Sequence, residues 1–377
     1  MSDSDPKPAL SLPILTAGDL TLRQLGDADI PGIVAQCTDP DSVRFTNAPT
    51  PYTAEDAARY VREVAPEGWR SESLLTFAIE YRGEFAGSLS LRPEEKIAKL
   101  GFGLAPWARR QHVMTRAIRL AIGWAFDRLD VDAVHWTAGS ENWASVRVAW
   151  ALGFRILGPV PALLNQRGVL VDGWFGSLQR DSAMLPTAPW LEPVPLFDDA
   201  SEETPILLRA IEEADLERFA EGCADPLTQS FSTMLEQPFT LDSAHRYLQR
   251  SRIVASTGSG VTWAATLARN GTLIGSVALF NISFPHANAE IGYWLHPDSR
   301  GLGLAQRIVA RAARHALIDV DDGGLGLQRI TARVMTPNSA SVAVLEKVGF
   351  TKVGREFNGL RGRDGQPQDS FLFELLP

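Results

Sequence analysis

The stretch Trp294-Leu-His-Pro-Asp-Ser-Arg300-Gly-Leu-Gly303-Leu-Ala305 decides the fold, because it marks a junction between two kinds of structure. An apolar segment ends at Leu295, and a turn with two glycines follows it. A helical period then begins, since apolar residues recur every four positions. These residues are Leu304, Ile308, Ala312 and Ala316, with Ala305 and Val309 alongside. The stretch therefore predicts a strand, a tight turn and a long helix, in that order.

The same junction predicts a site for an anion. A helix leaves its first backbone N–H groups without partners, and the helix dipole makes that end positive. Gly301 and Gly303 would let a phosphate approach the backbone closely. The dinucleotide fingerprint does not fit, because Gln306 stands where it needs a glycine, and the P-loop run Gly-Lys-Ser/Thr does not occur. Taken alone, the two glycines indicate a plain tight turn, and only a wider pattern favours a phosphate site.

The two halves of the chain repeat one another in the same order, which indicates a duplicated domain. Cys37 matches Cys223 at an offset of 186 residues, and Asp39-Pro40 matches Asp225-Pro226 at the same offset. Further matches pair 20–25 with 206–211, 76–78 with 262–264, 101–106 with 292–297, Asn142 and Ser145 with Asn338 and Ser341, and 153–154 with 349–350. We therefore expect two copies of one domain of about 170 residues.

The boundaries follow from composition. We expect one domain at residues 14–184, a linker at 185–203 and a second domain at 204–377. Pro-rich, charged and aperiodic sequence is typical of an extended linker. The linker holds the prolines Pro186, Pro189, Pro193 and Pro195 and the acids Glu192, Asp198, Asp199, Glu202 and Glu203.

Each copy alternates strand and helix patterns, shown here for the second. Expected strands are 206–209, 263–268, 275–282, 289–295, 328–334 and 371–375; expected helices are 215–220, 243–250, one beginning after 301 and a short one capped by Asn338. The predicted fold class is α/β (α+β). Each domain is expected to have a mixed, mostly antiparallel central sheet flanked by helices.

Composition excludes several classes of protein. The chain has 377 residues, a net charge of −9 and a pI near 5.3, which argues against a nucleic-acid or anionic-lipid partner. No apolar run could span a bilayer and residues 1–13 do not resemble a secretory signal, so a cytoplasmic protein without a membrane partner is expected. Cys37 and Cys223 are expected to be core thiols. His286 and His296 lack paired ligands at metal spacing, so no metal is expected.

The wider pattern resembles the GNAT acetyltransferase superfamily. It consists of Arg300-x-x-Gly303-x-Ala305, then Asn338-x-x-Ser341, then Glu346-Lys347-x-Gly349-Phe350. The branch most similar to it contains the ribosomal-protein N-terminal acetyltransferases. The resemblance covers nearly all of 204–377 and, more weakly, 18–182.

The resemblance implies a site for acetyl-CoA, used as co-substrate, in the second copy. Its pyrophosphate would lie on the backbone of residues 300–305, its pantetheine arm would run beside the strand 289–295, and Asn338 and Ser341 would lie near the thioester. The residues expected to bind it are Trp294, Leu295, His296, Arg300, Gly301, Leu302, Gly303, Leu304, Ala305, Asn338, Ser341 and Lys347.

Direct acetyl transfer needs a neutral amine and a stabilised leaving thiolate. Family members often place a carboxylate on this strand, so Glu290 is the candidate general base, with a surface glutamate as the alternative. Ser341 is the candidate donor to the departing thiolate; the alternative is a first-turn serine that only satisfies backbone groups. Tyr293 is expected to serve in packing.

The first copy departs from the pattern at the phosphate turn. His112 stands in place of Gly303, Met114 in place of Ala305, and Lys99 in place of Glu290. We expect a degenerate copy that has lost the cofactor. The alternative is a different anion site that uses Arg109 and Arg110.

The sequence thus predicts an N-acetyltransferase whose second domain moves acetyl from acetyl-CoA to an amine-bearing small molecule or a peptide N-terminus. The alternative is a non-catalytic acyl-CoA-binding or scaffold protein. The chain is expected to be a monomer, with its two copies forming a pseudo-dimer, or a homodimer.

Overall fold

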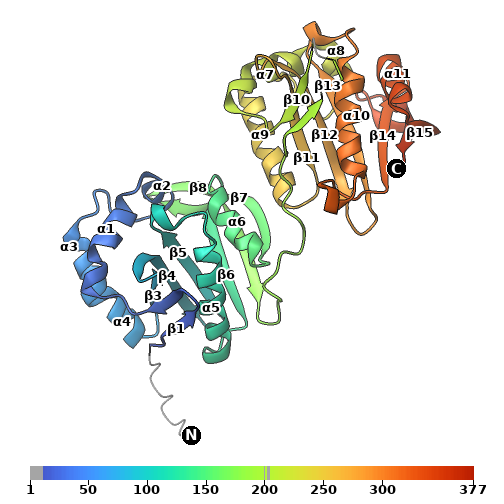
Figure 1. Cartoon of the computed structure of the whole chain (residues 1–377). Coiled ribbons are helices and arrows are strands. Elements are labelled where there is room, and N and C mark those ends of the chain that lie inside the picture. The colour runs from blue at the N-terminus through green and yellow to red at the C-terminus, as the bar shows by residue number, and fades with distance from the viewer. Residues whose placement is uncertain (1–11, 199, 202–203) are drawn as a thin grey trace. The chain divides into compact units, whose positions relative to one another are not determined.

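Two sheets of eight strands each organise the chain in this computed structural model (Figure 1). The structure describes residues 12–198, 200–201 and 204–377. The chain divides into two units, residues 1–187 and residues 188–377. Each unit holds one sheet and the helices that cover it, as the sequence predicted.

The first unit contains β1 to β8 and α1 to α6. The strands are β1 (Leu15–Ala17), β2 (Leu20–Arg23), β3 (Leu75–Tyr81), β4 (Glu84–Glu94), β5 (Ile97–Leu104), β6 (Ala133–Gly139), β7 (Arg155–Gln166) and β8 (Val169–Gln179). The helices are α1 (Ile30–Thr38), α2 (Pro40–Phe45), α3 (Ala54–Arg59), α4 (Ala65–Arg70), α5 (Val113–Arg128) and α6 (Trp143–Ala151), with a π-helical turn at Tyr60–Val64.

The second unit repeats this order. Its strands are β9 (Leu196–Asp198), β10 (Ile206–Arg209), β11 (Val261–Leu267), β12 (Leu273–Ser283), β13 (Asn288–Leu295), β14 (Arg329–Met335), β15 (Thr351–Arg361) and β16 (Pro367–Leu375). Its helices are α7 (Leu216–Ala224), α8 (Pro226–Phe231), α9 (Leu241–Ser256), α10 (Leu304–Leu317) and α11 (Ser339–Val348). Sequence patterns missed β9, β15 and α8.

The two sheets have the same topology. Their strand orders are β1-β2-β3-β4-β5-β6-β8-β7 and β15-β16-β14-β13-β12-β11-β10-β9. Neighbouring strands are antiparallel except for β5 with β6 and β13 with β14, which are parallel. The prediction of a mixed, mostly antiparallel sheet in each domain is confirmed.

The core of the second unit lies on both faces of its sheet. The four-residue period of α10 forms a buried stripe in which Ile308, Ala312 and Ala316 are fully covered. This stripe packs on one face of the sheet together with Leu345 of α11. Phe219 of α7 and other apolar residues of α7 and α9 cover the opposite face. An amphipathic helix on each face is what a sheet buried on both sides requires.

The repeat extends to buried ion pairs. Arg23 donates to both carboxylate oxygens of Asp29 at 2.8 and 2.9 Å. Arg209 makes the same bidentate contact with Asp215 at 2.6 and 2.9 Å. Both aspartates are buried, at 2% and 4% exposure, so each carboxylate needs its arginine partner.

Part of the predicted linker belongs to the second sheet. β9 lies within 185–203 and pairs with β10 in an antiparallel register. Leu191 and Leu196 are buried in the core of the second unit. The prediction of an extended linker is therefore wrong at this strand, because the segment carries apolar side chains that a neighbouring strand can cover. Residues 199, 202 and 203 of the predicted linker lie outside the described residues, as do residues 1–11 of the N-terminal segment.

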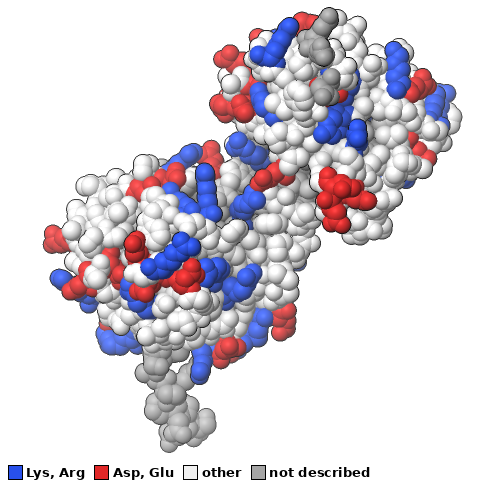
Figure 2. Space-filling model, in the orientation of Figure 1, with Lys and Arg blue, Asp and Glu red and all other residues white. Residues whose placement is uncertain are grey.

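Both cysteines are free, Cys223 buried and Cys37 half-buried. Among the described residues, no helix is long and apolar enough to cross a membrane. Basic and acidic side chains are interspersed on the face that Figure 2 shows, which differs from the basic stripe typical of nucleic-acid binding.

Candidate active site

The turn before α10 has the geometry of an anion site. Gly301 and Gly303 both adopt left-handed backbone angles, with φ of +76° and +73°. Gly303 is the N-cap of α10. Gly301, Leu302 and Gly303 are exposed, and no described residue accepts a hydrogen bond from their backbone N–H groups. The first turn of α10 adds further N–H groups without intrahelical acceptors, so the turn can accept a phosphate.

The side chain of Arg300 is hydrogen-bonded to other residues of the second unit. Its Nη2 donates to Asp225 Oδ2 at 2.6 Å and to Thr228 Oγ1 at 2.8 Å, both at the start of α8. The same guanidinium donates to the carbonyl of Leu295 at 3.3 Å. Burial raises the pKa of Asp225 and the Arg300 hydrogen bond lowers it, with a net lowering. Arg300 therefore fixes the turn against α8, and its backbone N–H donates to the carbonyl of Pro297 at 3.4 Å.

Strands β13 and β14 part in the middle of the sheet. They pair only from Asn288 with Arg329 to Glu290 with Thr331, although both strands continue beyond that point. Glu290 thus occupies the last paired position of β13 before the strands part. Its carboxylate accepts a hydrogen bond from Asn281 Nδ2 at 3.4 Å and makes no ion pair among the described residues. Asn281 lies in a bulge of β12 with φ of +53°.

Helix α11 presents Ser341 to β13. Asn338 caps the helix, because its Oδ1 accepts from the backbone N–H of Ser341 at 3.1 Å. The hydroxyl of Ser341 lies 2.8 Å from the hydroxyl of Tyr293 on β13. Burial raises the pKa of Tyr293 to about 12, and the hydrogen bond with Ser341 opposes that rise. The Ser341 hydroxyl is thus paired with a side chain, and the capping role falls to Asn338.

The three residues before the turn are structural. Trp294 packs edge-on against Phe219 of α7, with ring centroids 4.9 Å apart. Leu295 packs against the core on the α10 side. His296 is 9% exposed, and its Nδ1 lies 2.8 Å from Asp298 Oδ1. The predicted contacts of these side chains with the cofactor stay predictions, and the packing gives each a structural role.

The remaining predicted cofactor-binding residues lie at the start of α10 or in the last turn of α11. Leu304 is 4% exposed and belongs to the core, so only its backbone faces the turn, whereas Ala305 is half-buried and Leu302 is 68% exposed. Lys347 lies exposed in the last turn of α11, about 9 Å along the helix from Ser341. A cofactor contact of Lys347 stays a prediction without a described partner.

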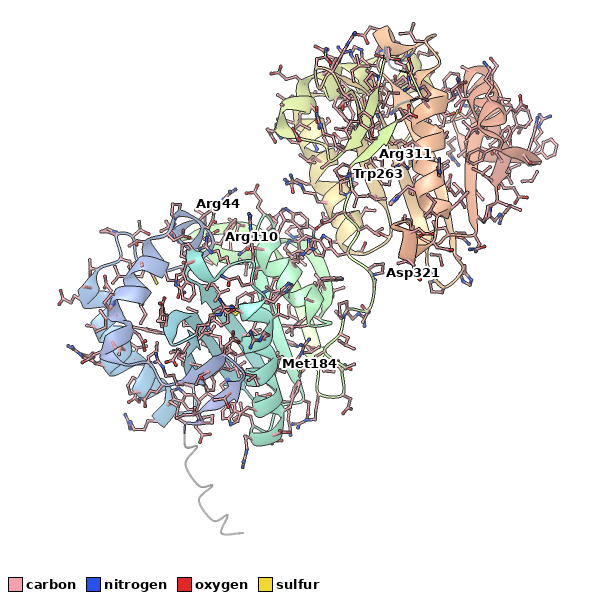
Figure 3. The ribbon with its side chains drawn as sticks, in the orientation of Figure 1. Arg44, Arg110, Met184, Trp263, Arg311 and Asp321 are labelled. Carbon is pink, nitrogen blue, oxygen red and sulfur yellow. The ribbon has the colours of Figure 1, made fainter. Side chains whose placement is uncertain are left out.

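The first unit keeps the backbone of the turn without its glycines. Arg110, which Figure 3 labels, stands at the position of Gly301, and His112 stands at that of Gly303. Their φ angles are +61° and +56°. The left-handed backbone of the turn is thus kept without glycine, and the expected loss of the cofactor by the first copy stays a prediction. Met114 is 4% exposed and lies in the core, so its side chain does not cover the turn. The exposed side chains of Arg110 and His112 are what distinguish this turn from the glycine turn of the second unit.

Other side chains of the first unit are already paired. Arg109 contacts Asp39 and Asp41, as Arg300 contacts Asp225, so Arg109 is not free to bind an anion. Lys99, at the position of Glu290, pairs with Glu94 at 2.7 Å. The Ser145 hydroxyl accepts from the indole of Trp136 at 3.0 Å.

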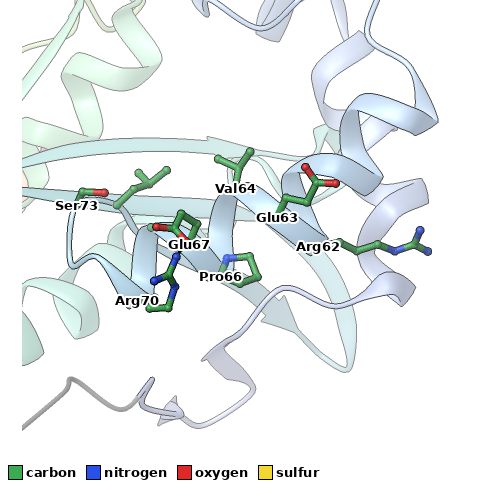
Figure 4. Close-up of a pocket in the computed structure, with 9 residues that line it drawn as sticks. Arg62, Glu63, Val64, Pro66, Glu67, Arg70 and Ser73 are labelled. Carbon is green, nitrogen blue, oxygen red and sulfur yellow. Dashed lines mark hydrogen bonds and ion pairs between the residues drawn. The ribbon is translucent and has the colours of Figure 1, made fainter.

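A shallow hollow of about 730 Å³ lies elsewhere in the first unit (Figure 4). It is lined by residues of the π-helical turn and α4 and by residues 73–74, which precede β3. Its arginines are paired, Arg62 with Asp27 and Arg70 with Glu67. The hollow contains none of the predicted site residues.

Sequence reasoning missed Asp225, Thr228 and Asn281 and assigned only packing to Tyr293. The repeated Asp-Pro pair, at 39–40 and 225–226, is a signal that could have predicted α2 and α8, because each aspartate caps its helix. No group of three or more His, Cys, Asp or Glu suited to a metal occurs in the described part of the chain.

Comparisons with known proteins point to one family for both units. A family model described as an acetyltransferase (GNAT) domain matches residues 19–155 and again residues 206–351. The uncharacterized N-acetyltransferase YoaA of Bacillus subtilis is 28% identical over 174 residues, which cover 45% of this chain and 93% of the relative.

Solved structures similar to this chain include two acetyltransferases. RimJ of Mycobacterium smegmatis, in complex with CoA-disulfide, is 23% identical with a TM-score of 0.42, and the match covers 48% of this chain and 85% of RimJ. The ribosomal-protein-S5-alanine acetyltransferase of Vibrio fischeri is 20% identical with a TM-score of 0.41, and the match covers 48% and 96% of the two chains.

Proposed function

This chain belongs to the GNAT acetyltransferase family in both of its units, and on that premise we propose that the second unit moves an acetyl group from acetyl-CoA to an amine. One observation carries the proposal: the second unit alone combines the glycine turn before α10, a carboxylate where β13 and β14 part, and a hydroxyl at the start of α11. In the first unit the equivalent positions hold His112, Lys99 and a Ser145 paired with Trp136.

The residues of the second unit fit acetyl-CoA. Backbone N–H groups of residues 301–305 would bind its pyrophosphate, since no described residue accepts from those of 301–303. An added β-carbon at Gly301 would meet nothing within 4 Å, which leaves room for a ligand. When bound, acetyl-CoA supplies an activated acyl group on a thiol leaving group.

Glu290 is proposed as the general base. A protonated amine cannot attack a carbonyl carbon, so a carboxylate must accept its proton, directly or through a water. Asn281 holds the Glu290 carboxylate from one side, and no described cation pairs with it. The amine nitrogen then forms the new bond to the acetyl carbon, and Ser341 donates a hydrogen bond to the sulfur that receives the electron pair.

The acceptor is proposed to be a small amine or a peptide N-terminus. Relatives of both kinds occur in the family, one titled a spermidine N-acetyltransferase and one a ribosomal-protein-S5-alanine acetyltransferase. The alternative function is non-catalytic binding of acyl-CoA. Glu290 favours the enzyme, because it supplies a proton acceptor where β13 and β14 part, which binding of acyl-CoA alone does not require.

Thiol release from acetyl-CoA in the presence of a panel of amines and N-terminal peptides tests the proposal. Amine-dependent release that stops in Glu290→Gln supports it. Tight binding of acetyl-CoA by calorimetry without release for any acceptor would favour the binding protein instead.

The first unit is proposed to be a degenerate copy. Calorimetric titration should then give one acetyl-CoA per chain, and His112→Ala should leave that number unchanged. Two sites of similar affinity would contradict this division. Loss of the single site on changing Arg110 would also contradict it.

A further inference from the structure

Tyr293 and Ser341 form a hydroxyl pair at the point where the sheet opens. Tyr293 lies on β13 beyond the last residue that pairs with β14, and Ser341 lies in the first turn of α11. Their oxygens are 2.8 Å apart, and the Tyr293 oxygen lies 3.3 Å from the backbone carbonyl of Ser341.

The two oxygens can share their protons in two ways. In one, Ser341 donates to Tyr293, and the tyrosine donates to the carbonyl of Ser341. In the other, Tyr293 donates to Ser341 Oγ, so that the serine proton points away from the tyrosine. Only the second arrangement leaves the Ser341 proton free for another acceptor, and a donor to Oγ also polarises that O–H bond.

Burial keeps Tyr293 protonated in the working range of an enzyme, because its pKa rises to about 12. The raised pKa disfavours transfer of the tyrosine proton to a thiolate. Tyr293 is therefore unsuited to be the proton source, and it retains an O–H that can donate at every working pH.

From this geometry we infer that Tyr293 is a positioning residue that aims the Ser341 hydroxyl at the leaving sulfur of the acyl donor. The inference rests on the proposed acetyl transfer. Tyr293 donates to Ser341 Oγ, and Ser341 donates to the sulfur as the carbon–sulfur bond breaks and its electron pair moves to sulfur. No proton leaves Tyr293 in this step, and the serine proton strengthens the hydrogen bond as charge develops.

The first unit does not form an equivalent hydroxyl pair between its strand and its helix. Phe102 occupies the position of Tyr293, so no hydroxyl reaches the helix from the strand. Ser145 occupies the position of Ser341, but it is 9% exposed and accepts from buried Trp136. The same serine with the same Asn142 cap is thus turned into the core when the tyrosine is absent.

A double-mutant cycle on the full chain tests the inference. Tyr293→Phe keeps the ring and removes the hydroxyl, and we expect kcat to fall about 3- to 10-fold with the KM for acetyl-CoA changed less than about 2-fold. Ser341→Ala should lower kcat by about 10-fold. The double variant should be no slower than Ser341→Ala, because the tyrosine acts through the serine.

The matched control is Tyr60→Phe, which removes another tyrosine hydroxyl paired with a hydroxyl, that of Thr76 at 3.2 Å in the first unit. It should leave kcat unchanged. Additive losses in the double variant, or a Tyr293→Phe enzyme with full kcat, would overturn the inference while acetyl transfer itself remained. Absence of amine-dependent thiol release in the unmodified chain would instead refute the proposed function.

Discussion

Gly303→Asp is the substitution that tests the phosphate turn most directly. Gly303 has φ of +73°, and an added β-carbon would meet only the flexible end of Gln306 at 3.5 Å. The chain itself therefore has room for a side chain, and the cost to folding is that of the left-handed backbone. His112 already accepts that backbone at the equivalent position of the first unit, with φ of +56°.

Gly303→Asp should affect stability and acetyl-CoA binding to clearly different extents. A left-handed non-glycine residue costs about 1–2 kcal/mol, which lowers the melting temperature of a unit of this size by about 2–8 °C. The aspartate would cover the N–H groups of the turn and place a like charge beside the pyrophosphate. Loss of two charge-assisted hydrogen bonds at about 1.5–3 kcal/mol each weakens binding by at least about 100-fold.

The assay is calorimetric titration with acetyl-CoA beside a thermal melt. Gly303→Asn separates charge from bulk, because asparagine tolerates the left-handed region and carries no charge. His112→Asp places the same charge on the equivalent turn of the first unit and should not change affinity. Unchanged affinity in a folded Gly303→Asp variant would refute the assignment of this turn to the pyrophosphate.

Three further predictions concern the base, the core and pH. Glu290→Gln should lower kcat by about 10²–10⁴-fold with acetyl-CoA affinity preserved. The control Lys99→Gln, in the first unit, should have no effect. A decrease in kcat of less than about threefold at every pH would mean that another residue is the base. Gly222→Ala should cost about 1–3 kcal/mol in urea unfolding, because its β-carbon would lie 2.3 Å from the Trp294 ring; unchanged stability would show that the ring can move. Burial lowers the pKa of His315 in the folded chain, so below about pH 6.5 the unfolded chain binds more protons than the folded chain. The free energy of unfolding should therefore fall as the pH drops through that value. This fall should be absent in His315→Gln. If the unmodified chain and His315→Gln lose equal stability between pH 7.5 and 5.5 in urea titrations, His315 is not the cause of the acid sensitivity.

Residue patterns along the chain predicted most of the architecture. The four-residue period after Gly303 predicted α10, and Asn338 predicted the cap of α11. The fixed order of matching segments predicted two domains with one topology. These features depend on neighbours a few residues apart, which is why helical periods, caps and tight turns can be predicted without knowing the fold.

The same patterns misjudged short strands. β9 was hidden in a segment whose prolines and acids indicate a linker, although Leu196 is buried and pairs across to β10. A three-residue strand has too little sequence to show a period. Its identity comes from the edge of the sheet that it covers.

What only the tertiary structure decided is the partner of each side chain at the site. Arg300 meets Asp225 across 75 positions of the chain, and Tyr293 meets Ser341 across 48. The sequence by itself determined that a turn, a strand and a capped helix occur in this order. Which hydroxyl faces which, and which arginine is already paired, depends on how the sheet opens and how the helices pack on it, because contacts between residues far apart in sequence exist only once the chain is folded.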